Sequence, residues 1–300
     1  MRKNVEFGTE DGTVLRGWWY AGEGSDSRPG IVMAHGFSAT KEMFLDDFAE
    51  LFHGAGFDVL VYDNRNLGES DSPLPGEIDP WQQVHDYRDA ITWFSQQGGV
   101  DADRIGVWGS SYSGAHVLVV AAIDRRVRCV VSQVPLVTGL ENARRLVRSD
   151  HWDGLRAAFD ADRRARLAGE PPAMIPVAFE NTPDEPCALP TQDTHDFFFG
   201  PIRERATTWR NEVTLRSVEL FTEYEPQAYV PRISPTPLFM VVATGDVLTP
   251  CDLALSAYEK ALEPKRLLTL PGGHFDAYVD EAFAVSGPAQ LQWFTEHLLK

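Results

Sequence analysis

Short apolar segments alternate with amphipathic segments along most of this 300-residue chain, and this alternation limits the folds that it can adopt. Apolar runs with the length of buried strands lie at residues 30–34, 57–62, 105–109, 127–133, 238–243 and 266–270. The spacing of apolar residues predicts helices at about residues 40–53, 80–97, 113–123, 252–262 and 288–299. Short buried strands separated by helices form a mostly parallel sheet that helices cover on both faces. The sequence therefore predicts an α/β fold.

Two further local features belong to this prediction. Alternating polarity at residues 5–8 and 14–19 predicts an antiparallel hairpin ahead of the parallel strands. Thr40 is expected to cap the first long helix, and Trp81 is expected to face the core from the second.

The alternation stops between residues 139 and 232. This stretch begins with an Arg- and Asp-rich helical segment, continues through a proline-rich passage and ends in an aromatic-rich part. We interpret residues 139–232, the lid segment, as a cap inserted over the carboxyl edge of the sheet, where open α/β sheets bind ligands. The α/β core is then expected to comprise residues 1–138 and 233–300. The aromatic residues of the lid segment either line an apolar pocket or only anchor the segment on the core.

One strand-to-helix junction carries the strongest functional signal. Residues 105–115 read Ile-Gly-Val-Trp-Gly-Ser-Ser-Tyr-Ser-Gly-Ala, an apolar strand that passes through small residues into a helix. In a nucleophile elbow, the serine lies on a strained turn, and the residues two positions before and after it must be small. Gly109 and Ser113 meet this requirement around Ser111, although Ser113 stands where the usual pattern has glycine. Ser111 is therefore the predicted nucleophile.

Two neighbouring serines are alternatives to Ser111. A nucleophile at Ser110 would place Trp108 two positions before it, where a bulky residue does not fit. Ser113 falls in the first turn of the following helix, where serine is a natural capping residue.

A serine hydroxyl needs an adjacent base to become a nucleophile, and the chain contains eight histidines. His274 follows the last strand in a Gly-Gly-His turn and is the predicted base. Other histidines fall on predicted helices or in the lid segment, where packing or surface roles are simpler: His53, His85, His116, His151, His195 and His297.

The acid that would orient this base is predicted at Asp246, in a Gly-Asp turn after strand 238–243. Such an acid fixes the imidazole tautomer and stabilises the imidazolium. Asp252 and Asp276 are alternatives. Asp252 resembles a helix N-cap, and Asp276 is close to His274 in sequence alone.

The first parallel strand ends in Met-Ala-His-Gly-Phe at residues 33–37. An elbow nucleophile of this kind uses one backbone N–H after that strand and one directly after the serine to bind the oxyanion. We assign these donors to Phe37 and Tyr112. His35 is expected to support the loop rather than to react.

Together with these turns, residues 62–70 (Tyr-Asp-Asn-Arg-Asn-Leu-Gly-Glu-Ser) make the chain resemble the α/β-hydrolase superfamily over about residues 5–138 and 235–300. The order Ser111, Asp246, His274 also matches that fold. Segments 79–90, 109–116 and 132–135 resemble a dienelactone-hydrolase-like group that includes fungal polyketide thiohydrolases, polyketide acyltransferases and Xaa-Pro peptidase-like hydrolases.

The resemblance implies several expectations about chemistry. Its members act on esters, thioesters or amides through an acyl-enzyme, and Asp63, Arg65 and Ser70 would belong to a structural loop behind the site, with Arg65 paired to carboxylates. A serine at the elbow excludes haloalkane dehalogenases and epoxide hydrolases, which have aspartate there.

Three functions from different classes follow. The leading hypothesis is a serine hydrolase that cleaves a carboxylic ester or thioester, with peptidase activity as a weaker variant. The second is an acyltransferase that moves a polyketide-type acyl group to an alcohol or amine with the same triad. The third is a non-catalytic homologue that binds a small ligand.

Composition limits the partners. The formal net charge of −17 disfavours binding to nucleic acid. We expect a cytoplasmic protein that does not bind membranes, because no signal-peptide pattern, no bilayer-length apolar run and no cysteine framework is evident. The expected partner is a small-molecule acyl substrate, and the sequence allows a carrier protein or a homodimer.

No cofactor or metal is expected for a triad of this kind. The stretch Asp-Thr-His-Asp at residues 193–196 contains metal-ligand types, but adjacent residues seldom converge on one ion.

Overall fold

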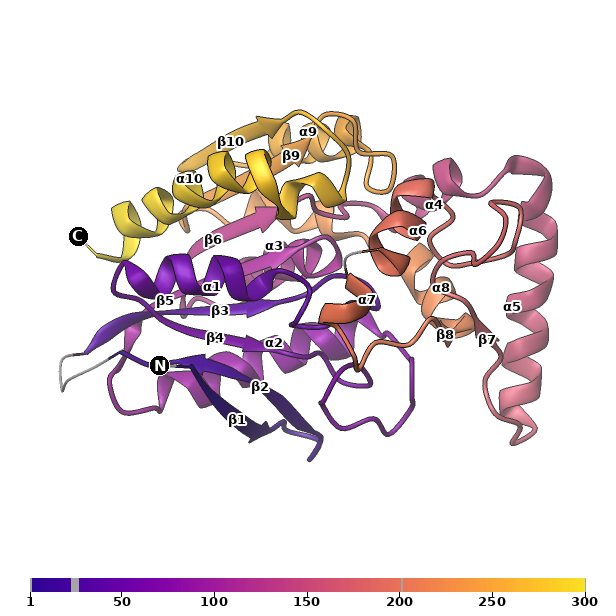
Figure 1. The fold of residues 1–300 in the computed structure, drawn as a ribbon, viewed down its shortest axis with the longest axis horizontal. Coiled ribbons are helices and arrows are strands. Elements are labelled where there is room, and N and C mark those ends of the chain that lie inside the picture. The colour runs from indigo at the N-terminus through magenta and orange to yellow at the C-terminus, as the bar shows by residue number, and fades with distance from the viewer. Residues whose placement is uncertain (1, 23–26, 201, 300) are drawn as a thin grey trace.

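The computed structural model describes residues 2–22, 27–200 and 202–299. Within these residues, one eight-stranded sheet has the strand order β1-β2-β4-β3-β5-β6-β9-β10 (Figure 1). The strands are β1 (Arg2–Gly8), β2 (Val14–Tyr20), β3 (Arg28–Ala34), β4 (Asp58–Tyr62), β5 (Val100–Ser110), β6 (Val127–Gln133), β9 (Leu238–Ala243) and β10 (Lys265–Leu270). The predicted hairpin is confirmed, since β1 and β2 pair antiparallel. β2 also pairs antiparallel with β4, and the remaining neighbours in the order β4-β3-β5-β6-β9-β10 pair in parallel.

The central parallel strands are mostly apolar because helices cover both faces of the sheet. Along β3 and β4, alternate side chains enter two different clusters: Val32 and Leu60 pack on one face, and Ile31 and Val59 on the other. Helices α2 (Pro80–Ser95), α3 (Tyr112–Ile123) and α9 (Cys251–Lys260) cover the first face, while α1 (Leu45–Gly54) and α10 (Asp280–Leu298) cover the second. The predicted α/β fold is confirmed.

Helix boundaries and one helix face differ from the prediction. The first helix begins at Leu45 rather than Thr40, because Phe44 adopts a left-handed conformation with φ 64° and the Thr40 hydroxyl donates to Glu42. The last helix begins at Asp280 and contains Pro288 internally. Trp81 lies on the outer side of α2 with 42% of its surface exposed.

The lid segment holds mostly short elements. They are α4 (Gly139–Leu146), η1 (Ser149–His151), α5 (Trp152–Leu167), β7 (Met174–Ile175), α6 (Gln192–Phe199), α7 (Ile202–Arg205), β8 (Val213–Thr214), α8 (Leu215–Glu223), η2 (Pro226–Ala228) and η3 (Val230–Arg232). Figure 1 shows its helices gathered at one end of the molecule, beyond the carboxyl ends of the parallel strands. The division of the chain at residues 138/139 and 232/233 stays a prediction.

Ion pairs link the lid segment to the core. Arg145 of α4 pairs with Asp252 of α9 at 2.5 Å, and Arg205 of α7 pairs with Asp46 of α1 at 2.5 Å. These pairs are partly exposed, so each contributes little free energy and mainly fixes orientation.

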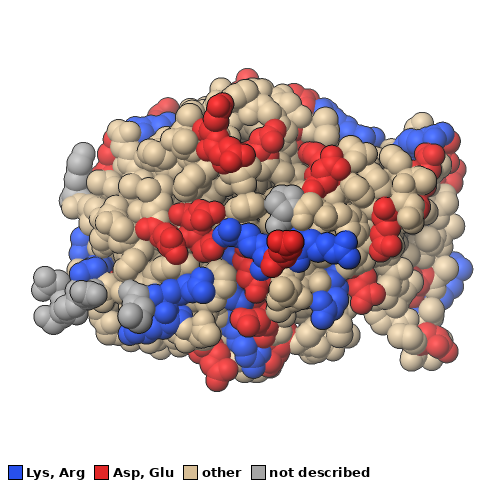
Figure 2. Space-filling model, viewed as in Figure 1, with Lys and Arg blue, Asp and Glu red and all other residues tan. Residues whose placement is uncertain are grey.

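The surface carries charges of both signs. On the face in Figure 2, Lys and Arg side chains lie among Asp and Glu side chains.

No helix of the described part of the chain has the length and apolarity needed to cross a bilayer.

Candidate active site

The turn between β5 and α3 has the geometry that an elbow nucleophile requires. Ser111 directly precedes α3 and has φ 58° and ψ −114°, a backbone conformation that is strained for a residue other than glycine. A Cβ atom at position 109 would lie 2.0 Å from the Ser113 carbonyl oxygen, so the turn closes only with Gly109. The glycine predicted two positions before Ser111 is therefore needed for the turn itself.

The structure separates the three candidate serines. The Ser111 hydroxyl lies 3.0 Å from Nε2 of His274. The Ser110 hydroxyl is buried and donates to the Tyr278 hydroxyl at 2.6 Å instead. The Ser113 hydroxyl is buried and has no hydrogen-bond partner among the residues described. Of the three, Ser111 is the one placed against the predicted base.

His274 joins Ser111 to Asp246. Its Nδ1 lies 2.7 Å from Oδ2 of Asp246, and both side chains are about 1% exposed. An Nδ1–H that donates to Asp246 leaves the Nε2 lone pair facing the serine hydroxyl, which is the tautomer of a general base. The alternative acids have other partners, because Asp276 accepts from the Gly273 N–H at 2.7 Å and Asp252 pairs with Arg145.

The turn that carries Asp246 also holds its carboxylate in place. Oδ1 accepts hydrogen bonds from the backbone N–H groups of Leu248 (2.9 Å) and Thr249 (2.7 Å). Oδ2 accepts one from the Thr249 hydroxyl at 2.8 Å, beside the bond from His274. Four donors thus surround a nearly buried carboxylate, which satisfies its lone pairs and orients it.

The predicted oxyanion loop lies against the nucleophile. A Cβ atom at Gly36 would be 2.8 Å from the Ser111 Cβ and 3.2 Å from its Oγ, so the loop after β3 can pass this closely only as glycine. Phe37 and Tyr112 follow Gly36 and Ser111 directly, and their rings meet edge to face at 5.4 Å. Among the residues described, neither backbone N–H has an acceptor in the protein.

His35 supports this loop. Its Nδ1–H donates to the Gly36 carbonyl at 2.9 Å, and its Nε2 accepts from the Asn64 N–H at 3.0 Å. Burial lowers the pKa of His35, and Asp63 opposes this only in part, so the ring is neutral.

A charged network lies behind the site. Arg65 donates to Asp86 and to Asp11, so its predicted pairing with carboxylates is present. The Ser70 hydroxyl donates to the Asp63 carbonyl oxygen at 2.6 Å, and the buried Lys41 ammonium donates to the Asp63 carboxylate at 2.6 Å. Each of these charges has a partner of opposite sign, which fits a structural role.

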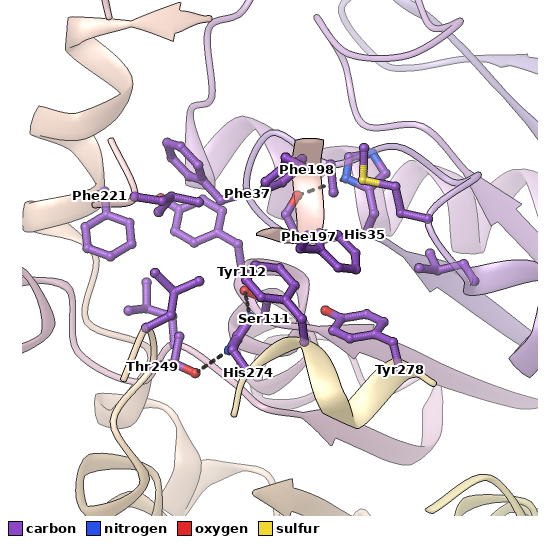
Figure 3. A pocket seen from close by; sticks show the side chains of 18 residues that line it. His35, Phe37, Ser111, Tyr112, Phe197, Phe198, Phe221, Thr249, His274 and Tyr278 are labelled. Atoms are coloured by element: carbon purple, nitrogen blue, oxygen red, sulfur yellow. Dashed lines mark hydrogen bonds between the residues drawn. The ribbon is translucent and has the colours of Figure 1, made fainter. Parts of the chain in front are cut away.

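A pocket opens above Ser111 between the core and the lid segment (Figure 3). The residues that line it are His35, Gly36, Phe37, Ala39, Met43, Leu45, Ser111, Tyr112, Leu136, Leu189, Phe197, Phe198, Phe221, Leu248, Thr249, His274, Phe275 and Tyr278. Its cavity volume is only about 30 Å³, so the pocket is narrow. This shape suits a slender or flat apolar group.

The aromatic residues of the lid segment serve in both of the ways considered above. Phe197, Phe198 and Phe221 line the pocket. Trp209 stacks on Phe198 with ring centroids 4.7 Å apart, and Phe199 meets Trp209 edge to face, so these two support the wall from behind.

Comparison with known proteins identifies the group to which this architecture belongs. A family model described as "Alpha/beta hydrolase family" matches residues 31–285. The chain belongs to the α/β-hydrolase family.

Among curated α/β-hydrolase relatives, the chain is similar to the thiohydrolase aneE of Aspergillus aculeatus, with 34% identity over 88% of this chain and 83% of that protein. It is also similar to the polyketide transferase grgF of a Penicillium species, with 31% identity over 99% of this chain and 97% of that protein. The crystal structure of that α/β hydrolase matches with a TM-score of 0.85 over the full length of both chains. A structure described as DcsB in complex with its substrate analogue matches at 0.89 with 28% identity, again over both full lengths. The predicted superfamily is confirmed, and relatives named thiohydrolase and polyketide transferase agree with two of the enzyme types named in the predicted subgroup.

A polar residue beside Asp246 in this α/β-hydrolase site was not predicted from the sequence. The Thr249 hydroxyl lies 2.8 Å from Asp246 and 3.1 Å from Nδ1 of His274, and it can also donate to the Val134 carbonyl. The spacing Asp-x-x-Thr was a usable signal, because an Asp side chain commonly accepts from backbone N–H groups two and three residues later.

In the acidic stretch at residues 193–196, the His195 side chain contacts neighbours within the lid segment. His195 lies 3.0 Å from Asp196 and stacks on Phe179 with ring centroids 4.8 Å apart. Among the described residues of this α/β hydrolase, no group of three or more His, Cys, Asp or Glu side chains converges as a metal site would require.

Proposed function

We propose that this α/β hydrolase is a serine enzyme that cleaves a thioester or carboxylic ester of an apolar acid through an acyl-enzyme intermediate. The observation that carries the proposal is the hydrogen-bonded series Asp246–His274–Ser111 at the floor of an apolar pocket. Three side chains from distant parts of the chain meet there in the order and spacing that nucleophilic catalysis needs.

In the acylation step, the Ser111 Oγ attacks the substrate carbonyl carbon and His274 Nε2 takes the hydroxyl proton. The carbonyl oxygen becomes an oxyanion that the N–H groups of Phe37 and Tyr112 stabilise. Loss of one such donor in comparable sites lowers the rate by about 10²–10³. The carbon–sulfur or carbon–oxygen bond then breaks, and the leaving thiolate or alkoxide takes the proton from His274.

In the deacylation step, a water molecule gives its proton to His274 Nε2 and attacks the acyl carbon. The tetrahedral intermediate collapses, the Ser111 oxygen leaves and takes the proton back, and a free carboxylic acid is released. Asp246 accepts the Nδ1–H bond throughout and stabilises the imidazolium that forms in each step.

The names of the relatives support a thioester as the substrate class. Two curated relatives at 34% and 32% identity are named thiohydrolases. The aromatic and aliphatic walls of the pocket would hold the acyl part, and none of the described residues that line it is an Asp, Glu, Lys or Arg that could bind a charged group.

Acyl transfer is the second candidate, and a specific observation favours it. His274 is 1% exposed and the pocket is narrow and apolar, so water reaches the acyl-enzyme poorly. An alcohol or amine that binds in the pocket could then compete with water for the acyl group. Curated relatives are also named polyketide transferase and acyltransferase.

A fluorophosphonate probe tests the nucleophile, because an activated serine attacks its phosphorus and expels fluoride. We expect one adduct, located by mass spectrometry on Ser111, and none in a Ser111→Ala variant. Ser113→Ala is the matched control, since the Ser113 hydroxyl has no partner among the described residues; it should label at the rate of the parent protein. Labelling at any other residue, or labelling that persists in Ser111→Ala, would contradict the proposed role.

Product analysis then separates the two reactions. A short acyl thioester is incubated with the enzyme alone and with added alcohols or amines. Free acid as the sole product assigns hydrolysis, and an ester or amide that forms at the expense of the acid assigns transfer.

A further inference from the structure

A chain of hydrogen bonds runs behind the nucleophile and ends at Tyr278. The indole N–H of Trp108 donates to Oε1 of Gln290, and Nε2 of Gln290 donates to Oε1 of Gln133 at 2.8 Å. Nε2 of Gln133 donates to the Ser110 hydroxyl at 3.4 Å, and Ser110 donates to the Tyr278 hydroxyl oxygen at 2.6 Å. The first four residues are fully buried and Tyr278 is 6% exposed.

The direction of this chain follows from its first member. An indole N–H can only donate, so it fixes which end of the Gln290 amide faces Trp108. Gln290 then fixes the amide of Gln133 in the same sense, and Ser110, which accepts from Gln133, directs its own proton to Tyr278. Every bond therefore donates towards the pocket, and such aligned bonds strengthen one another.

Tyr278 receives a hydrogen bond but still has its own proton to place. Its hydroxyl has no acceptor among the residues that the structure describes, although buried donors in native proteins are almost always satisfied. Tyr278 lines the pocket, and Figure 3 shows its hydroxyl turned towards the interior, beside the ring of Phe197. Burial raises the pKa of Tyr278 above its usual value, and the bond from Ser110 opposes this only in part, so the group stays a neutral donor.

The position of Tyr278 limits what it can reach. Its ring centroid lies 6.5 Å from that of His274 and 6.1 Å from that of Phe197. The ring of Tyr278 thus lies beside that of His274, and its hydroxyl lies 2.6 Å from the hydroxyl of Ser110, the residue before Ser111. From this position the hydroxyl could reach acyl atoms a few bonds from the carbonyl that Ser111 would attack. Two other polar side chains of the pocket are already engaged: both nitrogens of His35 have partners, and the Thr249 hydroxyl serves Asp246.

Tyr112 also lines the pocket, and its hydroxyl has no partner among the described residues. It differs from Tyr278 because nothing donates to its oxygen and so nothing orients its proton. The oriented donor of this pocket is Tyr278.

We propose that the Tyr278 hydroxyl donates a hydrogen bond to a carbonyl or hydroxyl oxygen on the acyl group, close to the scissile carbonyl. The enzyme then selects oxygen-bearing acyl chains over purely hydrocarbon chains of the same length. This inference rests on the proposed hydrolase or transferase function and specifies its substrate class. Ser110, Gln133, Gln290 and Trp108 act through Tyr278 as positioning residues.

The test compares Tyr278→Phe with the parent enzyme on matched thioesters of N-acetylcysteamine. The pairs are 3-oxobutanoyl and butanoyl, 3-hydroxybutanoyl and butanoyl, and 5-oxohexanoyl and hexanoyl. We expect the parent to prefer one oxygen-bearing member, and the variant to lose about tenfold or more in kcat/KM for it while changing less than about threefold on its hydrocarbon partner. Tyr258→Phe, which removes a tyrosine hydroxyl outside the pocket, should leave both values unchanged.

A Ser110→Ala variant tests the chain behind the tyrosine. It keeps the Tyr278 hydroxyl but removes the donor that orients it, so the preference for the oxygen-bearing thioester should fall part of the way. Thermal unfolding of each variant shows whether the fold is retained, and the preference is a ratio that a general structural loss does not change.

Each contrary result has a distinct meaning. If Tyr278→Phe lowers kcat/KM equally on all thioesters, or if the parent shows no preference within any pair, the inference about the acyl oxygen is overturned while the proposed function stands. If the parent turns over none of the thioesters and also fails to label with the fluorophosphonate, the proposed function falls and this inference falls with it.

Discussion

The replacement Asp246→Asn tests the proposed triad because it keeps the size and shape of the side chain while it removes the negative charge and turns one acceptor atom into a donor. In the parent protein, Oδ1 of Asp246 accepts from two backbone N–H groups, and Oδ2 accepts from His274 and from the Thr249 hydroxyl. An asparagine amide has one oxygen and one NH₂ group, so it can keep the acceptors on one side only.

The structure determines which side keeps its acceptor. With the amide oxygen at the Oδ1 position, the bonds from the N–H groups of Leu248 (2.9 Å) and Thr249 (2.7 Å) survive, and the NH₂ faces His274. The opposite orientation would set the NH₂ against two N–H donors and lose two hydrogen bonds, each worth about 0.5–1.5 kcal/mol, besides leaving buried donors unsatisfied. The first orientation is therefore favoured.

In that orientation, His274 must accept at Nδ1 and carry its proton on Nε2. Nε2 then presents a donor to the Ser111 hydroxyl, 3.0 Å away, and cannot take the serine proton. In serine hydrolases with this triad, the wrong tautomer lowers kcat by about 10⁴, which corresponds to a barrier about 5.4 kcal/mol higher. We expect a loss of this size in initial rates on a short p-nitrophenyl ester or acyl thioester, with KM little changed.

Asp252→Asn is the matched control, because it makes the same chemical change six residues away on a side chain that is 64% exposed. It should keep the parent rate within about a factor of three, since an exposed ion pair contributes little. The reasoning is refuted if thermal unfolding shows that Asp246→Asn is folded and the variant still retains more than about 1% of the parent kcat. That value is two orders of magnitude above the expected residual activity.

Two further predictions concern groups near the site. Thr249→Val removes the hydroxyl that donates to Asp246 at 2.8 Å, so kcat should fall about tenfold in steady-state kinetics with KM unchanged. An unchanged kcat would show that the hydroxyl does not orient Asp246. Burial lowers the pKa of His116 to about 3, below that of an unfolded histidine, so the unfolded chain binds the extra proton first as the pH falls. Stability is then full above about pH 6.5 and declines towards pH 3, and His116→Gln should flatten the dependence of Tm on pH between about 4 and 6.5. Burial also lowers the pKa of His35, so some slope should persist, and equal slopes in variant and parent would contradict the role of His116.

The parts of the fold that could be predicted are those in which local pattern and tertiary packing agree. Strands β6 and β9 begin and end where the apolar runs do, because both faces of each strand are covered and every side chain except that of Arg128 is buried. The first helix was misplaced by five residues because the turn at residues 40–44 has helical composition. Its conformation depends on the left-handed Phe44, which no local pattern indicates.

The candidate site could be predicted because its residues are tied to backbone positions. A strand end, a glycine turn and a small-residue elbow place Ser111, Asp246 and His274 at one edge of the sheet. Thr249 and Tyr278 were missed because their roles depend on what their side chains meet in space. Tyr278 lies in a one-turn helix, η4 (Phe275–Tyr278), whose only sequence signal is its nearness to His274.

In the lid segment, too, the sequence did not predict which way each side chain faces. Its aromatic residues indicated a pocket, but three consecutive phenylalanines on one short helix cannot all face the same way. In α6, Phe197 and Phe198 line the pocket, whereas Phe199 turns to Trp209 and His195. Phe197 reaches the site because it stacks on Phe275, next to His274, with centroids 4.2 Å apart. The wall of the pocket and the loop of the base are thus one packed unit, so a substitution at Phe197 acts on the position of the base as well as on the room for the acyl group.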